Sequence, residues 1–312
     1  MGVSAALGSS ALLPAGLGFR NKIINGDMRV AQRGASVTAS GAYTLDRWAQ
    51  VSGNSIVHTQ STDTPNASFL YSLSMAGTGT NIAQRIESLN CGGINGTITV
   101  SFWYKSTVGS DALSFALYTC NTADSFGSVT QVGSNITISS SPSSSWTYYS
   151  YTFTGVSSNS QNGVALYIFR GSGATSTTFV TGVQLEANSQ PTPFEQRPIG
   201  VELALCQRYF QVHTFNVAGY SGFVDTTTSF ITGGQLIEEM RSAPSLSPAP
   251  TAANFEVRRA GVAASAATAI SGNSTVFGVR LTVTTGATLT AGQGGFFTAG
   301  SGTQYLYWSS EL

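Results

Sequence analysis

Runs of alternating polar and apolar residues recur along most of this 312-residue chain and constrain its fold more than any other feature. The runs are rich in Thr, Val, Tyr and Phe, which suit a half-buried pleated surface, and clusters of Gly, Asn and Ser separate them. In the first part of the chain the clearest runs are 81–87, 97–105, 112–119, 146–154, 163–170 and 178–186. About seven or eight strands with no long helical run predict a β-sandwich or jelly roll.

A proline-rich segment and one short helix divide the β pattern into two parts. Residues 187–198 contain Pro191, Pro193 and Pro198, and proline lacks the N–H that a sheet ladder needs, so this segment is expected to be a stiff extended connector. The next stretch, 199–211, has apolar residues at helical spacing. The β pattern then returns, with strand candidates at 219–223, 229–232, 235–240, 255–259, 276–284, 296–300 and 304–309.

We therefore predict an all-β protein with two domains. A jelly-roll β-sandwich covers residues 21–190, a proline-rich linker and short helix cover 191–211, and a β-sandwich-like domain covers 212–312. Residues 1–20 are apolar and rich in small side chains, but Pro14 interrupts them and they lack a basic region at their start. They are too short for a membrane span and are expected to form an attachment arm ordered against a partner.

Two local patterns give more specific expectations. Asn95-Gly96 precedes the run at 97–105 and predicts a hairpin turn, because this dipeptide adopts the tight turn that joins two antiparallel strands. Aromatic residues occupy both alternating faces of the run at 146–154, which predicts a central strand covered on both sides. Trp103, between Phe102 and Tyr104, is likewise expected in the core.

Charged residues make up only 9% of the chain, and 14 Lys and Arg balance 14 Asp and Glu. A protein that binds nucleic acid needs a basic face to displace counterions from phosphates, and a membrane-surface protein needs a polybasic patch. Neither is present, so we expect no nucleic-acid partner and no membrane insertion. Low net charge favours self-association instead.

The residues that an active site needs are scattered. The two histidines, His58 and His213, lie in polar β segments and are expected at the surface or in turns. Glu238-Glu239 is the one adjacent acidic pair, and neighbours on a strand point to opposite faces. Pairs such as Asp27 with Asp46, or Glu87 with Glu186, leave glycoside hydrolysis open as a minor alternative. No phosphate loop, nucleophile elbow or zinc pattern occurs, so we predict no enzymatic activity.

No cofactor is predicted either. A structural Ca²⁺ ion would suit a jelly roll, but nothing in the sequence forms a calcium-binding loop. Cys91, Cys120 and Cys206 are widely spaced and are expected to be buried thiols. A bridge between Cys91 and Cys120 could form, although the spacing does not indicate one.

A binding surface is then the remaining functional feature. Aromatic residues are abundant, and flat rings flanked by Asn, Gln, Ser and Thr suit carbohydrate, because the ring stacks on the sugar's C–H face while neutral polar groups meet its hydroxyls. Most of these rings must belong to the core. Rings near turns or the carboxyl end are better candidates for exposure, and the predicted carbohydrate-binding residues are Tyr220, Tyr305, Tyr307 and Trp308.

Several motifs resemble a family of bacteriophage tail-fibre and related virion proteins. They are 21–34 (NKIINGDMRVAQRG), 43–48 (YTLDRW), 84–87 (QRIE), 101–106 (SFWYKS), 146–154 (WTYYSYTFT), 183–186 (VQLE), 193–210 (PFEQRPIGVELALCQRYF), 240–244 (MRSAP) and 305–312 (YLYWSSEL). The first domain also resembles the galactose-binding jelly rolls used as carbohydrate-binding modules. Most of these motifs make sense as framework: Asn25-Gly26 as a tight turn, Asp46 and Arg47 as an ion pair beside buried Trp48, and Glu195 and Arg197 as anchors of the proline-rich linker.

The resemblance implies a non-enzymatic virion protein, most simply a homotrimeric tail-fibre subunit that binds host-surface glycan. Residues 1–20 would then attach it to other virion proteins. A capsid decoration or head-fibre protein with the same fold is the alternative, and a fibre that depolymerises host polysaccharide is a third reading.

Overall fold

The computed structural model describes residues 19–37, 43–52, 57–77, 81–107, 113–138, 144–170, 176–216 and 219–312. The chain divides into two compact units, Met1–Glu202 together with Leu312, and Leu203–Glu311. Of the expected attachment arm, only Phe19 and Arg20 belong to the described residues.

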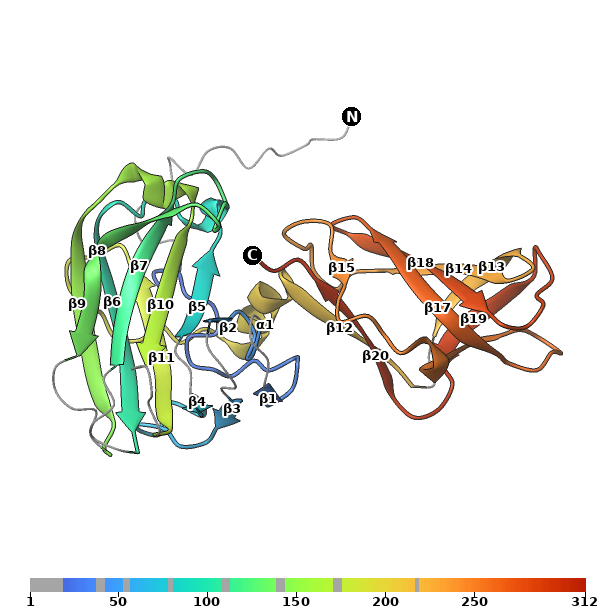
Figure 1. The fold of residues 1–312 in the computed structure, drawn as a ribbon, viewed down its shortest axis with the longest axis horizontal. Coiled ribbons are helices and arrows are strands. Elements are labelled where there is room, and N and C mark those ends of the chain that lie inside the picture. The colour runs from blue at the N-terminus through green and yellow to red at the C-terminus, as the bar shows by residue number, and fades with distance from the viewer. Residues whose placement is uncertain are drawn as a thin grey trace. The chain divides into compact units, whose positions relative to one another are not determined.

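The first unit is a jelly-roll β-sandwich of two antiparallel sheets (Figure 1). The six-stranded sheet has the order β1-β3-β4-β11-β6-β9, and the five-stranded sheet has the order β2-β5-β10-β7-β8. The strands of the first sheet are β1 (Ser36–Val37), β3 (Val57–Ser61), β4 (Ser72–Ala76), β11 (Thr178–Glu186), β6 (Gly96–Ser106) and β9 (Thr147–Val156). Those of the second are β2 (Ala49–Ser52), β5 (Asn81–Ile86), β10 (Val164–Arg170), β7 (Leu113–Cys120) and β8 (Val129–Ile138).

The core lies between the two sheets because every second residue of each strand points inward. On β6 the inward residues are Ile98, Val100, Phe102 and Tyr104, and on β7 they include Phe115 and Leu117, all of them buried. Phe102 and Phe115 meet edge to face across the sandwich, with ring centroids 5.4 Å apart. The residues between them, such as Trp103 and Lys105, therefore face outward from the six-stranded sheet.

The Asn95-Gly96 dipeptide is not a hairpin turn. The strand before it, β5, belongs to the five-stranded sheet, and β6 belongs to the six-stranded sheet. The connection between them contains the 3₁₀ helix η2 (Ser88–Asn90) and crosses from one sheet to the other. The glycine is still required locally, because Gly96 has φ of +73°, which side-chain-bearing residues rarely adopt.

The prediction of a central position for β9 is also wrong. The strand is the last of the six-stranded sheet and pairs only with β6 within it. Its inward residues Tyr149 and Phe153 contact Phe115, which satisfies part of the aromatic pattern. Tyr148, on the opposite face of the strand, is 42% exposed, whereas Tyr151 lies on the inward face, where its ring contacts Phe115. Aromatics on both faces of a strand thus indicated one core face and one accessible face.

The predicted helix is α1 (Ile199–Gln207), which is shorter than the stretch 199–211. It begins directly after Pro198, whose carbonyl accepts hydrogen bonds from the amides of Val201 and Glu202. It ends before Phe210, where the next strand starts. Among the described residues, no helix is long and apolar enough to cross a membrane.

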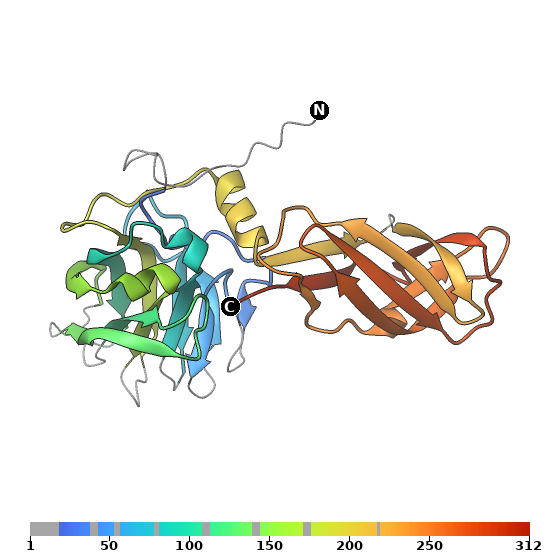
Figure 2. The same ribbon diagram turned by 90° about the horizontal axis from the view of Figure 1, so that it is seen from above.

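The second unit combines a three-stranded sheet with a closed barrel (Figure 2). The sheet has the order β12-β20-β15, from β12 (Phe210–Phe215), β20 (Gln304–Ser309) and β15 (Ser245–Leu246). The barrel has the order β13-β14-β18-β17-β16-β19, from β13 (Tyr220–Thr226), β14 (Ser229–Gln235), β18 (Gly278–Thr285), β17 (Ser265–Ser274), β16 (Phe255–Arg258) and β19 (Gly294–Ala299). The all-β prediction is confirmed. Six strands of the second unit close into a barrel, where the sequence predicted a sandwich-like arrangement.

Strand assignments in the second unit differ from the sequence pattern at several places, and neither β12 nor β15 was among the expected strands. The expected strand at 235–240 is wrong, because β14 ends at Gln235 and the chain turns over the following residues. Conversely, the small-residue stretch 260–269 contributes the start of β17, which has ten residues. The barrel interior is filled by large apolar side chains of the neighbouring strands, among them Phe230, Val257, Leu281 and Phe297, so β17 needs few of its own.

Both histidines are buried, in contrast to the surface positions expected for them. His58 on β3 is 1% exposed, and neither ring nitrogen has a hydrogen-bond partner among the described residues. Burial, with the positive charge of Arg170 adding to it, lowers the pKa of His58 to about 4. The three cysteines are buried thiols that form no disulfide, as predicted, and burial raises the pKa of Cys91 to about 12.

The low pKa of His58 makes the sandwich acid-sensitive. Below about pH 6.5 His58 is protonated in the unfolded chain, whereas in the folded chain it stays neutral down to about pH 4. Stability contributed by the neutral form is therefore complete above pH 6.5 and falls as the pH drops toward 4. We expect the free energy of unfolding, measured in urea, to fall between pH 7.5 and pH 5 by about 2 kcal/mol less in His58→Leu than in the wild type. Equal pH dependence in both proteins would contradict this.

Candidate functional site

A pocket of about 610 Å³ lies on the outer face of the six-stranded sheet in the first unit. Its floor comes from the sheet, one wall from the loop before β4, and another from the proline-rich segment. The lining residues are Asn66, Ser68, Phe69, Ser101, Trp103, Tyr148, Gly182, Pro191, Thr192, Pro193, Phe194 and Gln196. Pockets of this volume, with aromatic walls and a few polar groups, are typical of small-molecule and oligosaccharide-sized ligands.

The aromatic wall of the pocket runs across three strands. Trp103 on β6 is directly opposite Tyr148 on β9, and their ring centroids are 5.3 Å apart. On the other side of Trp103, β11 carries Gly182 at φ of +63°, and a Cβ there would lie 2.8 Å from Phe69 and 3.3 Å from Trp103. The missing side chain therefore lets Phe69 and Trp103 approach each other over β11. Phe69 in turn contacts Phe194, with centroids 5.4 Å apart.

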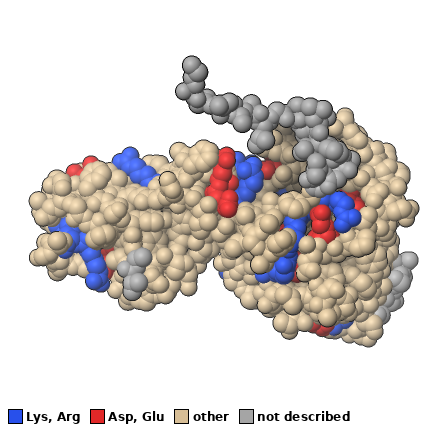
Figure 3. All heavy atoms as spheres, turned by 180° about the vertical axis from the view of Figure 1, so that it is seen from behind, with Lys and Arg blue, Asp and Glu red and all other residues tan. Residues whose placement is uncertain are grey.

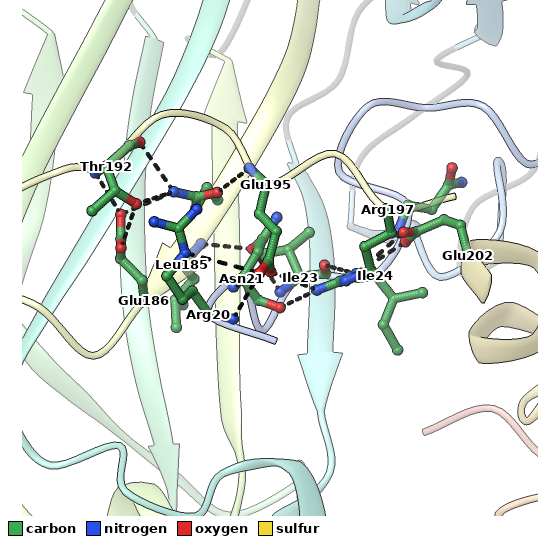
Figure 4. Close-up of polar contacts among 12 residues, drawn as sticks. Arg20, Asn21, Ile23, Ile24, Leu185, Glu186, Thr192, Glu195, Arg197 and Glu202 are labelled. Carbon is green, nitrogen blue, oxygen red and sulfur yellow. Dashed lines mark hydrogen bonds and ion pairs between the residues drawn. The ribbon is translucent and has the colours of Figure 1, made fainter. Parts of the chain in front are cut away.

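The proline-rich segment is held against the sheet by buried polar side chains of β11 (Figure 4). Gln184 donates from Nε2 to Glu186 Oε1 at 2.9 Å and to Thr192 Oγ1 at 3.1 Å. Glu186 accepts from the amide and the hydroxyl of Thr192, both at 2.8 Å. The amide of Glu195 donates to Gln184 Oε1 at 2.8 Å. These bonds fix the backbone on either side of Pro193, which forms part of the pocket wall.

A second group of contacts ties the same segment to the start of the chain. Glu195 accepts from the amide of Asn21 at 2.9 Å, and Asn21 Nδ2 donates to the carbonyl of Val183 at 3.0 Å. Arg197 donates to the carbonyls of Ile23 and Asn21 and pairs with Glu202 at 3.2 Å, with both side chains almost fully buried. Glu195 and Arg197 thus anchor the segment, although their side chains bond to the start of the chain and to Glu202 rather than to a sheet as expected. The segment is thus a wall of the site as well as a connector.

The framework motifs near the amino end support these contacts, which together form a polar clamp between β11, the start of the chain and the proline-rich segment. Asn25 has φ of +57° and its side chain bonds to Val30 and to the carbonyl of Asp46, while its own carbonyl accepts from the Trp48 indole at 3.0 Å. Asp46 pairs with Arg33, with 3.7 Å between the charged atoms. Gly26 lies so close to β11 that a Cβ there would be 2.2 Å from the Val183 carbonyl. The turn is therefore packed directly beneath the strand that carries Gly182.

A charged pair lies beside the aromatic wall on the same outer face. Lys105 bonds to Asp63, and its ammonium group lies over the rings of Trp146 and Phe179. Trp146 donates from its indole to Asp63 at 2.9 Å. The pKa of Asp63 is lowered overall: burial alone would raise it, but hydrogen bonds from Lys105 and Trp146 have the larger combined effect. The pair is therefore ionised and mutually neutralised at neutral pH.

The pocket itself is neutral. Its twelve lining residues carry no charged group: the polar side chains are amides and hydroxyls. The two carboxylic acids that glycoside hydrolysis needs are not among these twelve. Nor does any set of three His, Cys, Asp or Glu side chains in the described parts of the chain come together as metal ligands. On the face of the molecule drawn in Figure 3, most of the surface belongs to uncharged residues. The arrangement suits binding of a neutral, hydroxyl-rich ligand.

The four residues predicted from the sequence do not form one site. Tyr305 and Tyr307 lie side by side on one face of β20, with centroids 6.2 Å apart, and Tyr305 is 44% exposed. Trp308 points the other way and is fully buried. Tyr220 packs against Phe215 and shares a hydrogen bond with His213, and burial raises its pKa to about 12. The alternation of β20 explains this split, because residues 305 and 307 share one face and 306 and 308 the other.

A second aromatic surface lies on the outer face of the five-stranded sheet. Tyr118 and Tyr167 have centroids 5.0 Å apart, and Phe169 stacks 6.0 Å beyond Tyr167 at 16°. These partly buried rings rise above fully buried Ala116 and Ala165. Unlike Trp103, none of these three rings lines the pocket described above.

Comparison with known proteins gives distant structural likenesses. No family model matches the chain, and no curated protein matches it. Solved structures that match include the enzymatically active domain of tailspike protein 4 of bacteriophage CBA120, at 15% identity and a TM-score of 0.38 over 54% of this chain and 21% of that one. A xylan-binding domain from Paenibacillus barcinonensis matches at 12% identity and 0.34, over 53% and 93%.

A tandem of two such modules from the same organism covers 96% of this chain and 100% of its own, at 11% identity and a TM-score of 0.35. The chain spans about a fifth of the tailspike domain that it matches. At these identities and TM-scores the likenesses carry no argument about function.

The pocket depends on the absence of a side chain at position 182. We expect Gly182→Ala to destabilise the first unit by about 1–3 kcal/mol, because alanine is strained at positive φ and its methyl group displaces Phe69. Urea unfolding measures this. Gly92→Ala is the matched control: no atom lies within 4 Å of a Cβ at Gly92, so its effect should stay within about 0.5 kcal/mol. Equal effects of the two changes would show that the close approach is unimportant.

Proposed function

We propose that the first unit binds neutral carbohydrate in the pocket formed by Trp103, Tyr148 and the proline-rich segment. The observation that carries the proposal is the continuous aromatic wall of an uncharged pocket, with amide and hydroxyl groups on its rim. A pyranose ring presents C–H groups on its faces and hydroxyls at its edges. Stacked rings and neutral hydrogen-bonding groups match both parts of such a ligand.

The wider role follows from the motifs of the sequence. We propose a non-enzymatic virion structural protein at the surface of a phage particle, a homotrimeric tail-fibre subunit that recognises host-surface glycan. Residues 1–20 would attach it to other virion proteins. The resemblance of segments 21–34 and 193–210 to phage fibre proteins supports this role, as does the scarcity of charge. Three copies of a weak sugar site would bind a repetitive surface by avidity.

Replacement of the indole tests the binding site. Trp103→Ala should weaken glycan binding at least about tenfold, since loss of about 100 Å² of stacked apolar contact at about 25 cal/mol per Å² exceeds the 1.4 kcal/mol that a factor of ten requires. An array of neutral bacterial surface polysaccharides would identify a ligand, and calorimetric titration would measure its affinity for both proteins.

Tyr167→Ala is the matched control, because it removes a partly buried ring from the opposite sheet of the same unit. Unchanged affinity in this variant, with loss in Trp103→Ala, supports the pocket. The reverse result would move the site to the other sheet. Release of reducing ends from the bound polysaccharide would contradict the non-enzymatic role and favour the depolymerase alternative, and labelling of particles at the head would favour the capsid alternative.

A further inference from the structure

Two exposed phenylalanines on the barrel of the second unit form an apolar patch with opposite charges at its two ends. Phe223 on β13 is 50% exposed and Phe296 on β19 is 58% exposed. Both belong to the outward-facing set of their strands, since the residues between them, such as Val224 and Phe297, are buried. Large rings held in water on a folded strand are costly unless another surface covers them.

The strand register fixes the order of the side chains in this patch. Arg258 on β16 is opposite Phe296, and Phe296 is opposite Ser221 on β13. Phe223 follows two residues further along β13 on the same outer face, and exposed Asp225 lies just beyond it, at an irregularity in the β13–β14 register. The patch therefore runs from Arg258 through Phe296 and Phe223 to Asp225, with its cation and its anion at opposite ends.

The centre of the patch is a shallow depression, called the dent below, because Gly294 has no side chain there. Gly294 is exposed and lies opposite Phe223 in the β13–β19 ladder, next to Phe296 on its own strand. A Cβ at Gly294 would have no atom closer than the carbonyl oxygen of Gly222 at 3.9 Å. The position has room for a side chain and an ordinary backbone conformation, so the fold itself does not demand glycine there.

We propose that this patch binds a second copy of the same chain across a two-fold axis through Gly294. A two-fold axis in the plane of the contact exchanges the two ends of the patch. Phe296 then meets the partner's Phe223, and Arg258 meets the partner's Asp225. The patch is thus self-complementary: apolar rings meet apolar rings, and each charge meets the opposite charge.

The surrounding charges agree with this pairing. On the four strands β13, β14, β16 and β19, the charged residues are Asp225, Glu256 and Arg258. Glu256 bonds to Arg258 Nε of its own chain, while the Arg258 side chain remains 62% exposed and can donate to a further carboxylate. The two-fold operation brings Glu256 to the same end of the contact as the partner's Asp225, where Arg258 is the cation available to both carboxylates. A glycan would gain from the rings but not from a cation and an anion placed at the two ends.

The contact is separate from the proposed glycan site and from three-fold assembly. If the basic particle is a trimer, each chain carries one such patch and the two-fold contact joins trimers; if it is a single chain, the contact forms a dimer. In both cases association raises the mass at least twofold, because a trimer offers three such patches and a single chain offers one. The ratio of wild-type mass to variant mass therefore tests the proposal whatever the basic particle is.

Light-scattering mass measurements of the full chain over a range of concentrations test the contact. We expect the wild-type mass to rise to at least twice that of the double variant Phe223→Ser, Phe296→Ser, which should stay constant. Gly294→Gln should also stay at the lower mass, because its side chain fills the dent on the axis, while its unfolding transition remains that of the wild type. Equal masses of wild type and variants at every concentration would overturn the proposal.

Charge reversal separates this pairing from unspecific stickiness. Asp225→Arg or Arg258→Glu alone should weaken association about tenfold, since each places like charges together at both ends of the contact. The two changes combined restore opposite charges, and association should return to within about twofold of wild type. Failure of the combined variant to recover would exclude the two-fold arrangement even if the phenylalanines matter.

Discussion

The structure of the first unit depends on a buried polar clamp between β11, the start of the chain and the proline-rich segment. Gln184 and Glu186 face outward from the sheet, where water would normally solvate them, yet they are buried because residues 191–197 cover them. A buried amide or carboxylate without partners costs about 1–3 kcal/mol or more, so the segment that supplies these partners cannot move away freely. The clamp therefore turns a connector into a fixed wall.

A fixed wall matters for recognition because ordering a loop on binding subtracts from affinity. Phe194 lies between Glu195, which the clamp holds, and Pro193, whose ring fixes the backbone. Its contact with Phe69 is consequently present before any ligand arrives. Trp103 and Tyr148 are likewise set by strand pairing. The aromatic wall is thus preorganised by two independent means, hydrogen bonds on one side and sheet register on the other.

Much of the fold could be read from the alternating runs, since β5, β6, β7, β9, β10, β11 and β20 lie where the pattern placed them. The pattern could not place strands within sheets. Tyr148 shows why: alternation puts it on the opposite face of β9 from Tyr149, but only the packing of two sheets shows which of the two faces is the core. Trp103 likewise lies on the outer face of β6, although its apolar neighbours in the sequence predict a core position. Trp308 was assigned to the surface from its nearness to the end of the chain, although its parity on β20 pairs it with buried Leu306.

The candidate pocket was hidden from sequence reasoning because its parts are far apart in the chain. Phe69, Trp103, Tyr148 and Phe194 come from four segments, and none forms a motif with another. One signal was available: the motifs at 183–186 and 193–197 both contain polar residues unsuited to a plain strand or linker, which implies that each satisfies the other. Gly182, directly before the first motif, marks the close approach that the pocket needs.

The scarcity of charge has a consequence for how such a surface would behave in different media. Electrostatic attraction between proteins and their targets is screened over roughly 8 Å at physiological salt, and adhesion that relies on it weakens in brine. Stacking on Trp103 and hydrogen bonding to neutral amides involve no ions to be screened. A pocket of this kind would hold its ligand as firmly in seawater as in fresh water, at the expense of the long-range attraction that speeds first encounters.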